Sequence, residues 1–103
     1  MKLESIALHY GYNSDENDQK SATTPIYQTS GFTIDSTQHG ADLFDLKVEG
    51  NIYSRIGNPT NAVLEKRLAE MEGGIAALSL ASGMCAFTYA IQTIIWFGDN
   101  IVS

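Results

Sequence analysis

Cysteine is almost absent from this chain of 103 residues, in which Cys85 is the single one. A disulfide framework needs pairs of cysteines, and a cysteine zinc site needs several at close spacing, so the sequence offers neither. His9 and His39 are separated by polar stretches and have no metal-ligand spacing. A chain without disulfides suits a reducing compartment, and we therefore expect a cytoplasmic protein without a bound metal.

Lysine and arginine are also scarce. The six of them are scattered among twelve aspartates and glutamates, which gives a formal net charge of -6. Nucleic-acid binding depends on clustered basic side chains that neutralise phosphates, so no nucleic-acid partner is expected. A local site for one small anion remains compatible with this charge, because it needs only a few donors.

The sequence contains no hydrophobic run of membrane-spanning length. The longest run, from Ala86 to Phe97, is interrupted by Thr88, Gln92 and Thr93 and is shorter than the roughly 20 residues that cross a bilayer. The N-terminus lacks the apolar core and the small-residue cleavage site of a secretory signal. No association with a membrane is expected.

Apolar side chains, by contrast, make up 44% of the residues, while only 17% are charged. This balance is typical of a folded domain and not of a disordered segment. A compact domain of this length buries roughly two-thirds of the surface that its unfolded chain exposes, which allows one domain with a modest core. Most enzymes that bury an organic cofactor need a longer chain.

The first half of the chain shows little periodicity. Residues 6–8 are apolar and predict one or two helical turns, whereas residues 13–20 are polar and predict a solvated loop. Pro25 limits the β-prone segment 23–29 to an edge strand or an extended connector. A brief helix is expected over residues 40–44.

Clear helical periodicity begins after Asn58. This residue is a good N-cap, and Pro59 suits the first helical turn because its missing N–H is not needed there. Apolar residues recur at helical spacing as far as Met71, and Gly73 favours the left-handed conformation that ends a helix. The charged residues expected to point mostly outward from this helix are Glu65, Lys66, Arg67 and Glu70.

An apolar run over residues 76–80 predicts a buried strand. A second helix is predicted after Gly83 and is expected to end at Gly98, with another strand starting at Asn100. This alternation of helices and strands predicts an α/β fold with a parallel sheet, which needs several strands covered by helices. The chain supplies barely two strands, so either partners complete the sheet or the sequence begins a longer protein.

Two places in the chain suit an anion. Ser82 and Gly83 lie where the first strand would lead into a helix, and free N–H groups and the helix dipole attract negative charge there. Ordinary capping by Ser82 explains the same residues. Arg55 can hold a carboxylate or phosphate with two hydrogen bonds, and Tyr53 would point the same way in an extended segment. The alternative is a surface loop whose arginine pairs with a nearby acid.

These residues strongly resemble one enzyme family. The order and spacing of several segments are similar to those in the N-terminal part of the Cys/Met-metabolism pyridoxal-phosphate (PLP) enzymes: NIYSRIGNPT at 51–60, LEKRLA at 64–69, MEGG at 71–74 and ASGM at 81–84. Within the family, residues 24–30 and 50–53 are most similar to the O-acetylhomoserine sulfhydrylases. The resemblance covers nearly all of the chain.

The resemblance implies a fold, which is that of the aspartate-aminotransferase-like (fold type I) enzymes. Residues 1–57 would form an N-terminal arm and connector that reach the neighbouring subunit. Residues 58–103 would begin the large PLP-binding α/β domain. In this family the subunits form obligate dimers that assemble as homotetramers, so a homo-oligomer built as a dimer of dimers is expected.

The resemblance also implies cofactor-binding residues. Gly83 and Met84 would donate backbone N–H groups to the PLP phosphate within one subunit, whereas Tyr53 and Arg55 would reach the phosphate bound in the neighbouring subunit. Cys85 replaces the small residue that usually follows in the family, and we expect it to be a packed side chain.

The activity implied is γ-replacement, in which sulfide or a thiol replaces the acetate of O-acetylhomoserine, giving homocysteine for methionine biosynthesis. The family's PLP-binding lysine follows a Ser-x-Thr sequence, and no lysine here has that context. We therefore expect no catalytic residue in this segment and an inactive N-terminal portion of a longer transferase. The alternatives are cystathionine γ-synthase, cystathionine γ-lyase or methionine γ-lyase and, from another class, a non-catalytic truncated chain or interaction module.

Overall fold

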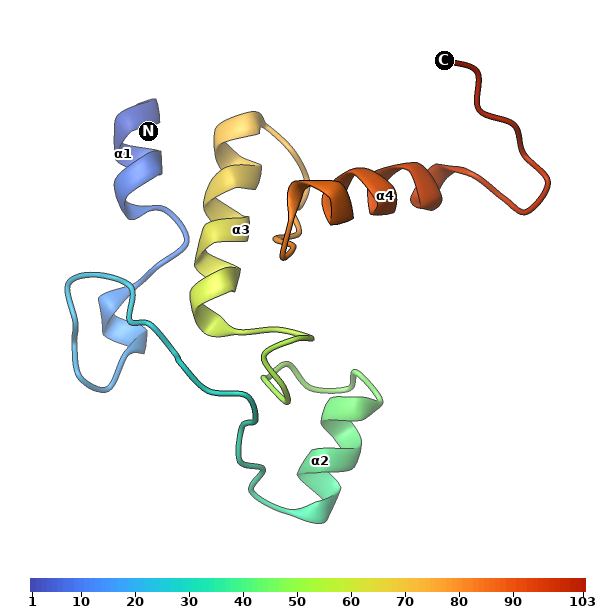
Figure 1. The fold of residues 1–103 in the computed structure, drawn as a ribbon. Helices are drawn as coiled ribbons and strands as arrows, with labels where there is room; N and C mark the ends of the chain where they lie inside the picture. Colours follow the sequence, from blue (N-terminus) through green and yellow to red (C-terminus); the bar gives the residue numbers. More distant parts are fainter.

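The computed structural model describes residues 1–103 as helices joined by long irregular connections (Figure 1). No ladder of paired strands is present, and the one strand-like pairing is an isolated antiparallel bridge between Gly31 and Tyr53. None of the helices has the length and apolar character needed to cross a bilayer. In chain order the elements are α1 (Leu3–His9), the 3-10 helix η1 (Ser14–Glu16), α2 (Thr37–Phe44), α3 (Pro59–Glu72) and α4 (Gly83–Ile94).

The helix α3 begins and ends where the sequence predicts. The Oδ1 atom of Asn58 accepts the N–H of Thr60 at 2.9 Å, and Pro59 is the first helical residue. At the other end Gly73 has φ = 66°, the left-handed conformation in which its N–H reaches the last carbonyls of the helix. A residue with a side chain is strained in that conformation, which explains the glycine.

The other helices are confirmed with shifted ends. The helix α1 contains the predicted residues 6–8, and α2 begins earlier than predicted because the Oγ atom of Ser36 accepts the N–H of His39 at 3.1 Å. The helix α4 stops at Ile94, before Gly98. There Asp99 Oδ2 accepts the N–H of Trp96 at 2.5 Å, and this turn replaces the last expected helical turn.

The strands predicted over 76–80 and from Asn100 are wrong for this structure, where both segments lack regular secondary structure. A strand requires hydrogen bonds to a neighbouring strand, and neither segment has one. The first segment is held by α3 instead, since Glu65 Oε1 accepts both the N–H and the hydroxyl of Ser79 at 2.8 Å. The sequence predicts that Glu65 points outward into solvent, and this prediction is wrong because its carboxylate is bonded to Ser79.

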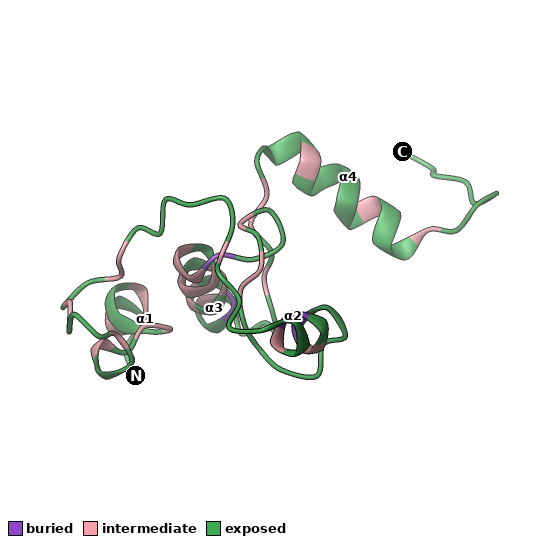
Figure 2. Ribbon diagram, turned by 90° about the horizontal axis from the view of Figure 1, so that it is seen from below, coloured by how far each residue is buried: buried purple, intermediate pink, exposed green.

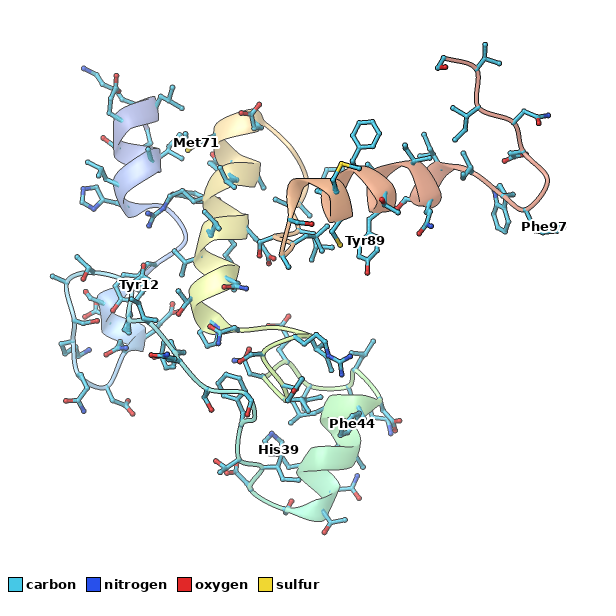
Figure 3. All side chains as sticks on the ribbon, in the orientation of Figure 1. Tyr12, His39, Phe44, Met71, Tyr89 and Phe97 are labelled. Carbon is cyan, nitrogen blue, oxygen red and sulfur yellow. The ribbon has the colours of Figure 1, made fainter.

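The helices α1 and α3 pack side by side (Figures 1 and 2). Figure 3 shows Met71 of α3 directed toward α1. The connection leaving α1 passes so close to α3 that a Cβ atom on Gly11 would lie 3.1 Å from the Cβ atom of Lys66. The Nε atom of Arg67 adds a hydrogen bond of 3.0 Å to the carbonyl of Tyr10. These contacts fix the N-terminal helix on α3.

The buried core is very small. Only Leu43 and Ala69 are buried apolar residues, so the predicted modest core is not formed. The accessible surface is 8787 Å², against about 5,700 Å² for a compact protein of this mass, and the radius of gyration is 17.0 Å, against about 13 Å. The helix α4 has no buried residue (Figure 2). Large apolar side chains exposed on or just after it are Met84, Phe87, Tyr89, Ile94, Trp96 and Phe97.

Candidate functional site

Tyr53 and Arg55 lie together on the turn that precedes α3. The guanidinium carbon of Arg55 is 5.4 Å from the centre of the Tyr53 ring, a cation–π contact. The sequence predicted an extended segment here, but the carbonyl of Tyr53 accepts the N–H groups of Ile56 and Gly57 at 2.9 and 3.0 Å. The segment is thus a turn, and the two side chains still meet.

Arg55 is exposed and takes part in no ion pair or hydrogen bond within the chain. The alternative of a loop arginine neutralised by a nearby acid is therefore wrong. Its guanidinium offers a fork of N–H donors with no acceptor in the chain, which is the arrangement that binds a carboxylate or phosphate with two hydrogen bonds.

The turn is fastened to the segment before α2 by backbone hydrogen bonds. The carbonyl of Ile52 accepts the N–H of Phe32 at 3.0 Å, and the N–H of Ser54 donates to the carbonyl of Ser30 at 2.7 Å. The hydroxyl of Ser54 donates to the carbonyl of Thr29. The turn that carries Tyr53 and Arg55 is therefore not a free loop.

Asn58 fastens the same turn from the side of α3. Its Nδ2 atom donates to the carbonyl of Tyr27 at 2.8 Å and to the hydroxyl of Ser54 at 3.0 Å. The neighbouring Thr60 hydroxyl accepts the N–H of Tyr27 at 2.9 Å and donates to the carbonyl of Pro25 at 2.8 Å. The sequence predicted Asn58 as a helix cap only, since nothing local indicates a bond to a residue so far back in the chain.

The second predicted anion site is the N-terminus of α4. The Ser82 hydroxyl accepts the N–H of Cys85 at 3.1 Å, so the alternative that Ser82 is an ordinary helix cap is confirmed. That cap leaves the N–H groups of Gly83 and Met84 without an acceptor in the chain, because the first residues of a helix have no carbonyl one turn earlier. Apart from the adjoining residues and the backbone of α4 itself, no atom lies within 4 Å of where a Cβ atom on Gly83 would stand. Capping and an open anion position thus coexist.

Tyr53 and Arg55 are in contact, and Gly83 and Met84 are consecutive residues in the first turn of α4. No hydrogen bond or ion pair links one pair to the other. Within one chain the two pairs therefore remain separate. Cys85 is a free, partly buried thiol on the first turn of α4.

The sequence of residues 4–103 matches the family described as "Cys/Met metabolism PLP-dependent enzyme". The chain belongs to this family. It is 52% identical, over 100% of its length, to O-acetyl-L-homoserine sulfhydrylase 1 of Thermus thermophilus. It is 46% identical, over 98% of its length, to a homocysteine/cysteine synthase of Saccharomyces cerevisiae. It is also 46% identical, over 96% of its length, to an L-methionine gamma-lyase of Treponema denticola.

The chain spans only 23–24% of the length of these relatives. A solved structure gives the same proportion: a protein from Campylobacter jejuni described as an O-acetylhomoserine (thiol)-lyase matches 96% of this chain and 24% of its own, with a TM-score of 0.89 and 41% identity. The fold is therefore that of the N-terminal part of the fold type I PLP enzymes, as the resemblance implied. The expected α/β class is confirmed by this match, although the described residues themselves are helical.

PLP is the cofactor of this family, and the Campylobacter jejuni structure carries it as N'-pyridoxyl-lysine-5'-monophosphate. The open positions described above fit its phosphate chemically. Two unused N–H groups at a helix N-terminus suit a dianion, and an unpaired guanidinium suits phosphate oxygens. A basic protein overall is not needed for such a site.

Proposed function

We propose that this chain is the N-terminal portion of a PLP-dependent O-acetylhomoserine sulfhydrylase. The whole enzyme would replace the acetate of O-acetylhomoserine by sulfide or a thiol, which makes homocysteine for methionine biosynthesis. The observation that carries the proposal is the 52% identity to the Thermus thermophilus sulfhydrylase along the entire chain. Sulfhydrylases and homocysteine synthases from other organisms match at similar identity.

In this proposal the chain supplies phosphate ligands. The N–H groups of Gly83 and Met84 would hold the PLP phosphate of their own subunit, and Tyr53 and Arg55 would hold that of the neighbouring subunit. The exposed, unpaired state of Arg55 and the vacant space beside Gly83 support these roles. When bound, PLP supplies the electron sink that the reaction needs. The arm of residues 1–57 and the domain start of residues 58–103 would then belong to a dimer of dimers.

The chain itself would hold no catalytic residue. None of its lysines follows a Ser-x-Thr sequence, and the amino groups of Lys20 and Lys47 pair with Asp15 and Asp45 at 3.4 and 2.9 Å. Trapping with borohydride in the presence of PLP tests this point. We expect no stoichiometric lysine adduct on the 103-residue chain, and a site-specific adduct would contradict the proposal.

A second candidate activity, methionine γ-lyase, is supported by the 46% identity to the Treponema denticola enzyme. The two activities are separated by their substrates. The full-length enzyme should form homocysteine from O-acetylhomoserine and sulfide faster than it releases a thiol from methionine. The reverse preference would favour the lyase, and no turnover of either substrate by PLP-loaded enzyme would favour a non-catalytic protein.

A further inference from the structure

Asn58 is a buried polar side chain with a partner for every hydrogen-bonding atom. Its exposed fraction is 7%, and no buried side-chain nitrogen or oxygen of the structure lacks a partner. The Oδ1 atom faces α3, where it accepts the N–H of Thr60, while the Nδ2 atom faces away from the helix. The amide thus joins two parts of the fold, since its oxygen is anchored on one part and its nitrogen on another.

The Nδ2 atom of Asn58 holds Ser54, the residue between Tyr53 and Arg55 in the sequence. Ser54 receives the Nδ2 hydrogen bond at 3.0 Å and passes its own hydroxyl hydrogen to the carbonyl of Thr29. The second Nδ2 hydrogen bond, at 2.8 Å, reaches the carbonyl of Tyr27. A shift of the turn relative to α3 would therefore break several hydrogen bonds at once and leave buried groups unpaired, which is costly.

We propose that Asn58 is a positioning residue that sets the place of Tyr53 and Arg55 relative to α3, and thereby the strength with which they hold a phosphate. This inference rests on the proposed function, because it assumes that these two side chains bind the PLP phosphate. Asn58 itself touches no ligand. Its effect passes through Ser54 and the turn.

The substitution Asn58→Ser separates this role from helix capping. Serine is as good an N-cap as asparagine and still offers an oxygen to the N–H of Thr60, but it lacks the amide donors for Tyr27 and Ser54. In the full-length apoenzyme we expect PLP affinity to fall about tenfold, while the affinity for pyridoxal, which has no phosphate, stays the same. The matched control Ser36→Ala removes the cap of α2 and should leave both affinities unchanged.

The same substitution in an Arg55→Ala background shows whether the effect passes through the turn. If Asn58 acts by placing Tyr53 and Arg55, the loss from Asn58→Ser should shrink from about tenfold to about twofold when Arg55 is absent. An equal loss in both backgrounds, or an equal loss of PLP and pyridoxal affinity, would show a general structural role and overturn the inference. Far-UV circular dichroism checks that each variant is folded.

The outcomes also separate this inference from the proposed function. Wild-type enzyme that binds no PLP overturns both together. If the wild-type enzyme binds PLP, and Arg55→Ala lowers its affinity but Asn58→Ser does not, then only the positioning role is overturned.

Discussion

The guanidinium of Arg55 lies over the ring of Tyr53, 5.4 Å from its centre, and has no carboxylate beside it although the chain carries twice as many acidic as basic residues. The ring holds the cation in one direction without neutralising it. A carboxylate in the same place would compete with any anionic ligand. Tyr53 thus orients the arginine and leaves its charge available.

Replacing Arg55 should weaken the retention of PLP. Arg55→Ala removes a charge-assisted fork of hydrogen bonds, and we expect the dissociation constant of PLP to rise about 10- to 100-fold. Arg55→Lys should fall between wild type and alanine, because a lysine carries the charge but not the planar fork. Titration of the apoenzyme followed by visible absorbance measures both. An unchanged constant in Arg55→Ala would refute the assignment.

Gly83→Ala should separate stability from cofactor affinity. The backbone there does not have a positive φ, and the added Cβ atom would meet nothing within 4 Å beyond the adjoining residues and the backbone of α4, so the free energy of unfolding should rise by at most about 1 kcal/mol. The methyl group would nevertheless stand where the phosphate approaches the N–H groups of α4, and PLP should bind about tenfold more weakly. Urea unfolding and PLP titration of one preparation give both quantities. A variant that binds PLP normally would contradict the proposed phosphate position.

Gly73→Ala should destabilise the end of α3. Its φ of 66° is strained for a residue with a side chain, and we expect a loss of about 1 kcal/mol in the free energy of unfolding. Gly74→Ala is the matched control, because Gly74 has no positive φ and its Cβ atom would meet only ordinary contacts, 3.7 Å from the carbonyl of Ala69. Urea denaturation compares the two, and equal losses would argue against the capping role.

Glu65→Ala should release the segment that follows α3. Removing the carboxylate leaves the N–H and hydroxyl of Ser79 without their acceptor in the chain, and because Ser79 is only partly buried we expect a cost of about 1 kcal/mol. Glu65→Gln keeps an oxygen and should lose less. Hydrogen exchange of the Ser79 amide reports the change directly, with Glu72→Ala as the control. Slow exchange that persists in Glu65→Ala would show that another contact protects this amide.

The Glu70 carboxylate makes the phenol of Tyr10 a weaker acid in the folded protein. Interaction with the nearby Glu70 carboxylate, whose negative charge disfavours the phenolate, raises the pKa of Tyr10 above its ordinary value. The folded protein therefore keeps this proton when the unfolded chain has lost it, and the resulting stabilisation is present at neutral pH and lost as the pH rises through the raised pKa. Glu70→Gln should lower the pKa of Tyr10, measured by NMR titration of its ring carbons. An identical pKa in the variant would contradict this origin.

Local chemistry made much of α3 predictable from the sequence. An N-cap at Asn58, a proline after it and Gly73 at the end act within one helical turn, so their effects can be read without knowledge of the fold. Resemblance to a family and the donor chemistry of arginine predict Tyr53 and Arg55 as phosphate-binding residues. An extended backbone was expected to point both side chains the same way, whereas the structure brings them into contact on a turn.

Contacts between distant segments were not predictable in the same way. The sequence predicts that Glu65 faces solvent because charged helical residues usually do, whereas its bond to Ser79 depends on the chain reversal at residues 73–74. The second hydrogen-bonding end of Asn58 reaches a residue 31 positions earlier in the sequence. Strand formation over 76–80 failed for a related reason, since it depends on a neighbouring strand and not on the segment alone.

The bonds that Asn58 and Thr60 make to the segment before α2 are bonds to its main chain. They reach the backbone of Pro25 and Tyr27 and not the side chains, while the intervening Ile26 is 83% exposed. Substitutions at Ile26 therefore leave these bonds in place. The turn that carries Arg55 is thus held by a main-chain seam that does not depend on which side chain stands at position 26.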